Sequence, residues 1–205
     1  QQLNQVEEFD HPQMKPYLTL GEAISDLPFI GVGEESFEYA SEPKNDFQKL
    51  MRKNALGKLM DHSAPKNSEK LVQIMKNLPE GGSPEDLPEK IRPKSGFKNT
   101  YCRLWWNRPS TTITRNLGTP SSSRCIHPKV ARPLTTREGA RIQCFPDDFK
   151  FYGSKSSRNL QIGNAVPVFL SQGLANSISE HFKENESLKY GKNNLKYARV
   201  PVFNS

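Results

Sequence analysis

The segment that most constrains how this chain can fold is 132–149, which reads RPLTTREGARIQCFPDDF. Thr135 and Glu138 have capping-box spacing, so each side chain can accept a hydrogen bond from a backbone N–H where a helix begins. Pro146 disfavours helical geometry in the residue before it, and the helix is therefore predicted to end near Phe145. The segment predicts a short, sharply delimited helix.

A second informative segment, 161–167, follows after a short spacer and reads QIGNAVP. Gly163 and Asn164 predict a turn, because both residue types tolerate left-handed backbone geometry. Pro167 is predicted to be the first residue of the next helix. That helix carries apolar residues at a repeating spacing of four, which predicts an apolar stripe: Leu170, Leu174, Ile178 and Phe182.

Charge is distributed unevenly along the chain, whose formal net charge is +7. Residues 1–43 carry one Lys or Arg against nine Asp and Glu, whereas residues 101–161 carry eleven against three. Positive charge therefore gathers around the two segments described above, as a phosphate-binding face requires.

The three cysteines, Cys102, Cys125 and Cys144, show neither CxxC pairing nor the spacing of metal ligands. They are interpreted as reduced structural thiols of an intracellular protein, and no metal site is expected. The sequence contains no apolar run of transmembrane length and no signal-peptide pattern, so no membrane partner is expected.

The residue order in both segments resembles the C-terminal signatures of the DNA (cytosine-5)-methyltransferase family, in its bacterial restriction–modification form. Segment 132–149 is similar to the ninth conserved motif of that family, and 161–167 is similar to the tenth. Upstream, 17–28 resembles the start of the family's target-recognition region. Segment 101–115 resembles an element that lies against DNA, and its Thr and aromatic content predicts a strand.

The resemblance implies an α/β fold, in which an irregular target-recognition domain joins the C-terminal helical segment of a doubly wound S-adenosylmethionine-dependent methyltransferase. Residues 1–16 are expected to be a leader from the catalytic half, and 17–149 the recognition domain with the ninth motif. Residues 150–185 are expected to pack on the catalytic domain, and 186–205 to form a polar tail.

Two helices are predicted inside the recognition domain from apolar residues at helical spacing. One covers 46–60, and the other covers 68–78 with Ser68 as its N-cap. Residues 79–99 hold several Pro and Gly among many charges, which predicts a surface loop.

No catalytic residue is assigned in this chain. By resemblance, the family adds a thiolate to cytosine C6 and transfers a methyl group from S-adenosylmethionine to C5 of a base flipped out of duplex DNA. The Pro-Cys dipeptide that supplies the thiolate is absent from the sequence. Cys144 follows Gln143 and stands where the family commonly has Gly, so it is interpreted as a packing thiol.

The resemblance implies that Gly163, Asn164, Ala165 and Val166 form one wall of the S-adenosylmethionine pocket. A purely structural turn remains an alternative for the first two. Hydroxyl and guanidinium groups suited to phosphates or base edges are expected to contact DNA from five positions: Thr112, Thr114, Arg115, Ser122 and Arg124. Strand propensity of the threonines and a plain solvated loop at 121–124 are the alternatives.

Arg137 and Glu138 are expected to form a buried charged pair that braces the recognition domain, with Arg141 beside them. The expected function is the recognition and cofactor-wall half of a DNA cytosine-5 methyltransferase, located in the bacterial cytoplasm. This half is expected to be inactive without an N-terminal catalytic half, either a separate subunit or a removed segment. The alternative is a non-catalytic DNA-binding or regulatory subunit derived from such an enzyme.

Overall fold

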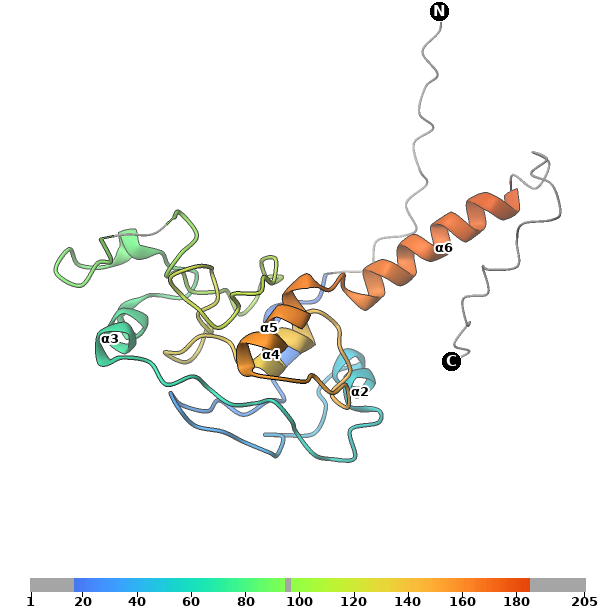
Figure 1. Ribbon diagram of the computed structural model, residues 1–205, viewed down its shortest axis with the longest axis horizontal. Helices are drawn as coiled ribbons and strands as arrows, with labels where there is room; N and C mark the ends of the chain where they lie inside the picture. Colours follow the sequence, from blue (N-terminus) through green and yellow to red (C-terminus); the bar gives the residue numbers. More distant parts are fainter. Residues whose placement is uncertain (1–16, 95–96, 185–205) are drawn as a thin grey trace, which may run out of the picture. The chain divides into compact units, whose positions relative to one another are not determined.

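The computed structural model describes residues 17–94 and 97–184 (Figure 1). The expected leader 1–16 and tail 186–205 lie outside the described residues. The chain divides into two compact units, Gln1–Ala165 and Val166–Ser205, and each is described by itself.

The first unit is built from short helices joined by long connections. Helix α4 contacts α1 and α5, and α1 also contacts α2, so α4 lies at the centre of the unit (Figure 1). The helices in chain order are α1 (Leu20–Ile24), α2 (Asp46–Arg52), α3 (Glu69–Asn77), the 3₁₀ helix η1 (Pro84–Asp86), α4 (Thr136–Ile142) and α5 (Lys155–Asn164).

Each α-helix of this unit begins at a side chain that accepts a hydrogen bond from the first turn, as N-cap residues do. The caps are Thr19, Asn45, Ser68, Thr135 and Ser154. Thr19 with Glu22, and Thr135 with Glu138, form complete capping boxes. The capping box predicted at Thr135 is therefore confirmed.

The sheet that an α/β fold requires is not formed by the described residues. Their only β pairing consists of three isolated bridges: Glu35 with Ser63, Arg103 with Ile126, and Ile126 with Pro133. The prediction of a strand within 101–115 is wrong, since only Arg103 of that segment joins a bridge. Trp106 accepts a hydrogen bond from the N–H of Gly21 instead, so tertiary context overrides local strand propensity.

The helix predicted over 46–60 is wrong beyond Arg52, where α2 ends. Leu56 and Gly57 both have positive φ, 47° and 73°, which is incompatible with a right-handed helix. The helix predicted over 68–78 is confirmed as α3, whose N-cap Ser68 accepts a hydrogen bond from the N–H of Leu71 at 3.4 Å.

Two apolar clusters form the core of the first unit. The larger cluster surrounds α4 and draws on segments throughout the unit: Leu20, Ala23, Ile24, Leu27, Leu59, Leu104, Ile113, Leu117, Leu134, Ala140, Phe151 and Ile162. The smaller cluster is formed by residues of α3 and the residues that pack against them: Ile74, Met75, Leu78, Leu87 and Ile126. Ile126 links the bridged segments to α3, while Ala140 and Ile162 join α4 to α5.

The predicted turn at Gly163 and Asn164 is wrong, because both residues lie in the last turn of α5. The chain becomes extended only at Ala165, which has ψ 145°, shortly before Pro167. Since proline disfavours helical geometry in the residue before it, α5 cannot continue into the next helix.

The second unit contains one long helix, α6 (Val168–Glu184). It begins one residue later than predicted, with the carbonyl of Pro167 accepting a hydrogen bond from the N–H of Ser171 at 3.0 Å. The apolar stripe is exposed along its length, at Leu170, Leu174, Ile178 and Phe182. None of the helices described in either unit is long and apolar enough to cross a membrane.

Candidate functional site

Helix α4 carries a buried carboxylate, Glu138, whose partner is Arg132. The Arg132 guanidinium donates to both carboxylate oxygens at 2.8 Å, and the two side chains are at most 1% exposed. The prediction that Arg137 and Glu138 form the charged pair is wrong. Consecutive side chains on a helix do not face each other, so Arg132, from the segment before the helix, reaches the carboxylate instead.

A buried histidine, His127, lies beside this ion pair. The backbone N–H groups of Lys129 and Val130 donate to its Nδ1 at 3.0 and 3.3 Å, so the proton of the neutral ring is on Nε2. That nitrogen lies 3.6 Å from the Glu138 carboxylate. Burial lowers the pKa of His127 to about 4, and the ring is therefore neutral near pH 7.

A second histidine, His62, contacts Thr135, the N-cap residue of α4. Its Nε2 lies 2.9 Å from the carbonyl of Pro28, which can only accept, so Nε2 donates and Nδ1 accepts from the Thr135 hydroxyl at 3.0 Å. The same hydroxyl accepts a hydrogen bond from the N–H of Glu138 at 3.2 Å. The Thr135 hydroxyl thus connects the capping box of α4 to His62. Burial lowers the pKa of His62.

Arg141 is the centre of a second buried network. Its guanidinium donates to Asp147 at 2.5 and 2.6 Å and to Asp26 at 3.0 and 3.1 Å. The Tyr39 hydroxyl donates to Asp147 at 2.7 Å, and Arg52 covers the Tyr39 ring. Burial opposes the charged form of Arg141, but the hydrogen bonds to Asp147 and Asp26 raise its pKa above the ordinary value. The network joins α4 to the end of α1 and to α2.

Arg137 is fully buried and bonds mainly to the backbone. Its guanidinium donates to three carbonyls at 2.8 to 3.3 Å: Met60, Pro146 and Phe149. It also lies 3.5 Å from the carboxylate of Asp61. Because a guanidinium has five donors in a fixed plane, Arg137 can fix both the distant residue Met60 and the residues that follow α4, Pro146 and Phe149, to this helix.

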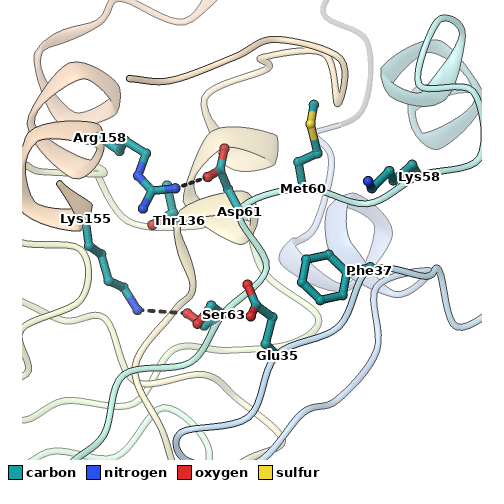
Figure 2. A pocket seen from close by; sticks show the side chains of 9 residues that line it. All are labelled: Glu35, Phe37, Lys58, Met60, Asp61, Ser63, Thr136, Lys155 and Arg158. Carbon is teal, nitrogen blue, oxygen red and sulfur yellow. Dashed lines mark hydrogen bonds and ion pairs between the residues drawn. The ribbon is translucent and has the colours of Figure 1, made fainter. Parts of the chain in front are cut away.

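Asp61 also borders a surface hollow of 360 Å³ that is walled by α5 on one side (Figure 2). In Figure 2, Arg158 of α5 pairs with Asp61, and Lys155 donates to the carbonyl of Ser63, at 2.8 Å. Asp61 therefore links Arg158 on α5 to Arg137 on α4, so the two helices share one carboxylate.

Helix α4 ends earlier than Phe145, at Ile142, in a Schellman motif. The N–H of Phe145 donates to the carbonyl of Ala140, and the N–H of Cys144 donates to that of Arg141. Cys144 has φ 62°, the left-handed geometry that usually selects Gly at this position. The glycine that the family commonly has here thus corresponds to a backbone requirement.

Cys102 and Cys125 are buried, and burial raises the pKa of both thiols, that of Cys125 to about 12. A nucleophilic cysteine needs a lowered pKa, so neither environment suits a nucleophile. Across 17–94 and 97–184, no group of three or more His, Cys, Asp or Glu side chains is arranged to hold a metal ion.

Three of the residues expected to contact DNA share one exposed segment. Thr112, Thr114 and Arg115 are exposed, whereas Ile113 between them is buried in the larger core cluster. Ile113 therefore anchors the segment while its neighbours face outward. Within the described residues, the guanidinium of Arg115 makes no ion pair or hydrogen bond.

The backbone of this segment lies directly against α5 at Gly163. A methyl group built on Gly163 would overlap the backbone nitrogen of Arg115 and lie 2.5 Å from its Cα. The end of α5 is capped by Gln143, whose side-chain amide donates to the carbonyls of Ile162 and Ala165, at 3.1 and 3.2 Å. The residues of the tenth motif are thus packed against both α4 and the exposed segment.

Ser122 is exposed, but Arg124 is engaged in the fold. Its guanidinium donates to the carbonyls of Gly81 and Arg103, at 3.0 and 2.6 Å, and stacks over the Trp105 ring at 4.4 Å. These contacts give Arg124 a structural role that its position in a Ser-rich loop does not suggest.

The four residues expected at the cofactor differ in exposure. Asn164 and Val166 are exposed, whereas Gly163 and Ala165 are half-buried. The side-chain amide of Asn164 makes no hydrogen bond within the described residues, so it can bond to a ligand.

Sequence reasoning missed the carboxylates and the arginine that complete the buried networks. Arg132 and Asp147 lie inside 132–149, where three Arg stand against three Asp and Glu, so the charges on this segment can pair with one another. Asp26 and Asp61 are distant along the chain, and no local pattern marks them as partners of α4.

Comparison with known proteins gives concordant results. The model of the family C-5 cytosine-specific DNA methylase matches residues 1–180. The type II methyltransferase M1.HphI of Haemophilus parahaemolyticus is 32% identical over 170 residues, covering 83% of this chain and 39% of the relative. M.DdeI of Desulfomicrobium norvegicum is 35% identical over 187 residues, covering 82% of this chain and 44% of the relative. The chain thus spans less than half the length of these relatives.

Among solved structures, a putative DNA modification methyltransferase encoded within a prophage of E. coli shares the fold, with a TM-score of 0.60. It is 24% identical in sequence, and the match covers 86% of this chain and 52% of that one. The family match extends into α6 as far as residue 180 and includes both segments 132–149 and 161–167. The chain therefore belongs to the C-5 cytosine-specific DNA methylase family.

Proposed function

We propose that this chain is the DNA-recognition and cofactor-wall part of a DNA cytosine-5 methyltransferase. The observation that carries the proposal is the exposed segment with Thr112, Thr114 and Arg115, anchored by buried Ile113 and packed against α5. Hydroxyl and guanidinium groups donate to phosphate oxygens and base edges. Duplex DNA is the proposed substrate, with Ser122 as a further contact.

Arg137, Glu138 and Arg141 act in this proposal as a brace that keeps the recognition residues in place. All three are buried on α4. Glu138 is paired with Arg132 and Arg141 with Asp26, both of which lie outside the helix. Buried ion pairs are weak evidence for net stability, so their proposed contribution is a single well-defined arrangement of the irregular connections.

The second part of the proposal concerns the expected segment 150–185, of which α5 packs on α4 and α6 is proposed to pack on the catalytic domain. The α6 stripe supports it, since Leu170, Leu174, Ile178 and Phe182 are 55 to 69% exposed, and exposed apolar surface of this kind marks an interaction site. This exposed apolar surface fits contact with a methyltransferase catalytic domain.

S-adenosylmethionine, when bound, supplies the methyl group. The free amide and exposure of Asn164 fit one wall of a polar ligand site. Asn164 would hold the ligand by hydrogen bonds, with Gly163 and Ala165 beside it in the wall.

We infer further that methyl transfer requires a polypeptide with the Pro-Cys nucleophile, because this sequence has no such dipeptide. The test incubates the pure chain with labelled S-adenosylmethionine and duplex DNA, with and without the N-terminal half of a relative such as M.DdeI. Incorporation is expected only in the mixture, and Asn164→Ala should raise the KM for S-adenosylmethionine there. Incorporation by the chain alone would refute the division into halves. DNA binding by the mixture without any methyl transfer would favour a regulatory subunit.

A further inference from the structure

Helix α5 is fixed to the rest of its unit at both ends. Near its start, Arg158 pairs with Asp61, and Lys155 donates to the carbonyl of Ser63. At its end, Gln143 caps the final carbonyls. A helix held in this way cannot shift to accommodate a larger residue on the face that touches the recognition segment.

Gly163 lies on that face, and the backbone of Thr114 and Arg115 occupies the space that a side chain would need. Ordinary contact between carbon atoms is about 3.5–4.0 Å, whereas a methyl on Gly163 would lie 2.5 Å from the Cα of Arg115. The recognition segment would have to withdraw by more than about 1 Å to restore normal contact, because the methyl would also lie 2.1 Å from the backbone nitrogen of Arg115. Its neighbouring anchor, Ile113, is buried and resists that movement.

We propose that Gly163 is a positioning residue for DNA recognition. Because Gly163 has no side chain, the backbone of Thr114 and Arg115 can lie directly against α5. This contact sets the direction in which the Arg115 guanidinium extends to a DNA phosphate. The proposal rests on the proposed function, since it requires that Arg115 meets DNA. It gives Gly163 a role toward the recognition segment in addition to the place in the cofactor wall that the resemblance implies for 163–166.

The test measures binding of a fluorescent duplex by the full chain over a range of salt concentrations. Each lost phosphate contact flattens the slope of log K against log salt by about 0.9. Arg115→Ala and Gly163→Ala should each flatten the slope by that amount, and the double variant should flatten it no further, because residues that act through one contact are not additive. A purely structural weakening lowers the melting temperature and leaves the slope unchanged.

Gly173→Ala is the matched control, because Gly173 is also helical but has nothing within 4 Å of an added methyl. This variant should keep the slope of the unaltered chain. If Gly163→Ala does not fold, Thr114→Gly is added, since glycine gives the segment the backbone freedom to withdraw. The variant that combines Thr114→Gly with Gly163→Ala should then fold, and its slope should be flatter than that of Thr114→Gly alone.

A normal slope in the folded Gly163→Ala protein overturns the positioning role, as does a normal slope in Arg115→Ala. In the first case Arg115 still contacts DNA and the proposed function stands, whereas in the second the proposed DNA contact of Arg115 fails as well. An unaltered chain without salt-dependent binding contradicts the proposed function itself. The two failures are therefore distinguishable.

Discussion

Arg132 holds Glu138 through two parallel hydrogen bonds of 2.8 Å, although Arg137 is the adjacent residue on the helix. The Nε of Arg132 donates to the carbonyl of Ile30 at 2.8 Å, so the pair also ties the start of α4 to a segment distant along the chain. Removing one member of a buried pair leaves the other charge without compensation, which costs far more than removing both.

The first prediction concerns this pair. Arg132→Met should destabilise the protein by about 3–5 kcal/mol, because Glu138 would remain buried without its partner. Arg132→Met combined with Glu138→Leu should recover much of that loss. Urea unfolding followed by circular dichroism measures both effects.

The control for this prediction is Lys129→Met, which removes the half-exposed ion pair with Glu80 at 2.7 Å. Exposed pairs contribute about 1 kcal/mol or less, so this variant should unfold close to the unaltered protein. Equal losses in Arg132→Met and Lys129→Met would contradict the importance of burial at Glu138.

The second prediction concerns the left-handed residue that ends α4. Cys144→Gly should stabilise the protein by about 0.5–1 kcal/mol, because glycine adopts φ 62° without the steric cost of a Cβ atom. Cys144→Ala keeps the Cβ and should give no such gain. Thermal melting of the two variants compares them directly, and a gain in both would point to the thiol rather than to the backbone.

The third prediction concerns acid stability. The pKa of His127 is about 4 in the folded protein and close to its ordinary 6.5 in the unfolded chain, so the unfolded state binds more protons between these values. Stability therefore rises with pH across this window, and about 3 kcal/mol is lost as the pH falls from 6.5 to 4. His62, whose pKa is also lowered by burial, adds to the loss with the same sign.

His127→Asn isolates the contribution of His127, since an amide oxygen can replace Nδ1 as the acceptor for the N–H groups of Lys129 and Val130 and does not titrate. The variant should lose less stability than the unaltered protein between about pH 7 and pH 5. Identical losses in urea unfolding at the two pH values would show that His127 is not the titrating group.

The sequence predicted the local features of this fold well where short-range chemistry decides them. The capping box of Thr135 and the cap at Ser68 are examples, because each depends on residues three apart. It failed at Gly163, where a Gly-Asn pair favours a turn but the helix from Ser154 continues through it. Gly163 packs closely against the backbone of Arg115, a distant contact that no local pattern contains.

The candidate site shows the same division between local and distant information. The charged residues of one short helix, Arg137, Glu138 and Arg141, were expected to be buried, and Arg141 is indeed buried. Its partner Asp26 lies on a distant segment, so the pairing depends on the tertiary fold. Arg137 was predicted to pair with Glu138, but Arg132 does so. The prediction failed because neighbours along the chain do not face each other on a helix.

The last prediction separates the two arginines that sequence reasoning treated alike. Arg124→Ala should destabilise the protein by about 2 kcal/mol, because Arg124 donates to two carbonyls and stacks on Trp105. It should leave the salt dependence of DNA binding unchanged, since those donors are already used within the fold. Arg115→Ala should behave in the opposite way, because Arg115 is exposed and its guanidinium has no partner among the described residues. The melting temperature and the salt dependence of DNA binding are measured for both variants. Arg124→Ala should change only the melting temperature, and Arg115→Ala should change only the salt dependence. A flattened slope in Arg124→Ala, with the melting temperature unchanged, would place Arg124 on the DNA after all and leave its contacts to Gly81 and Arg103 without a structural role.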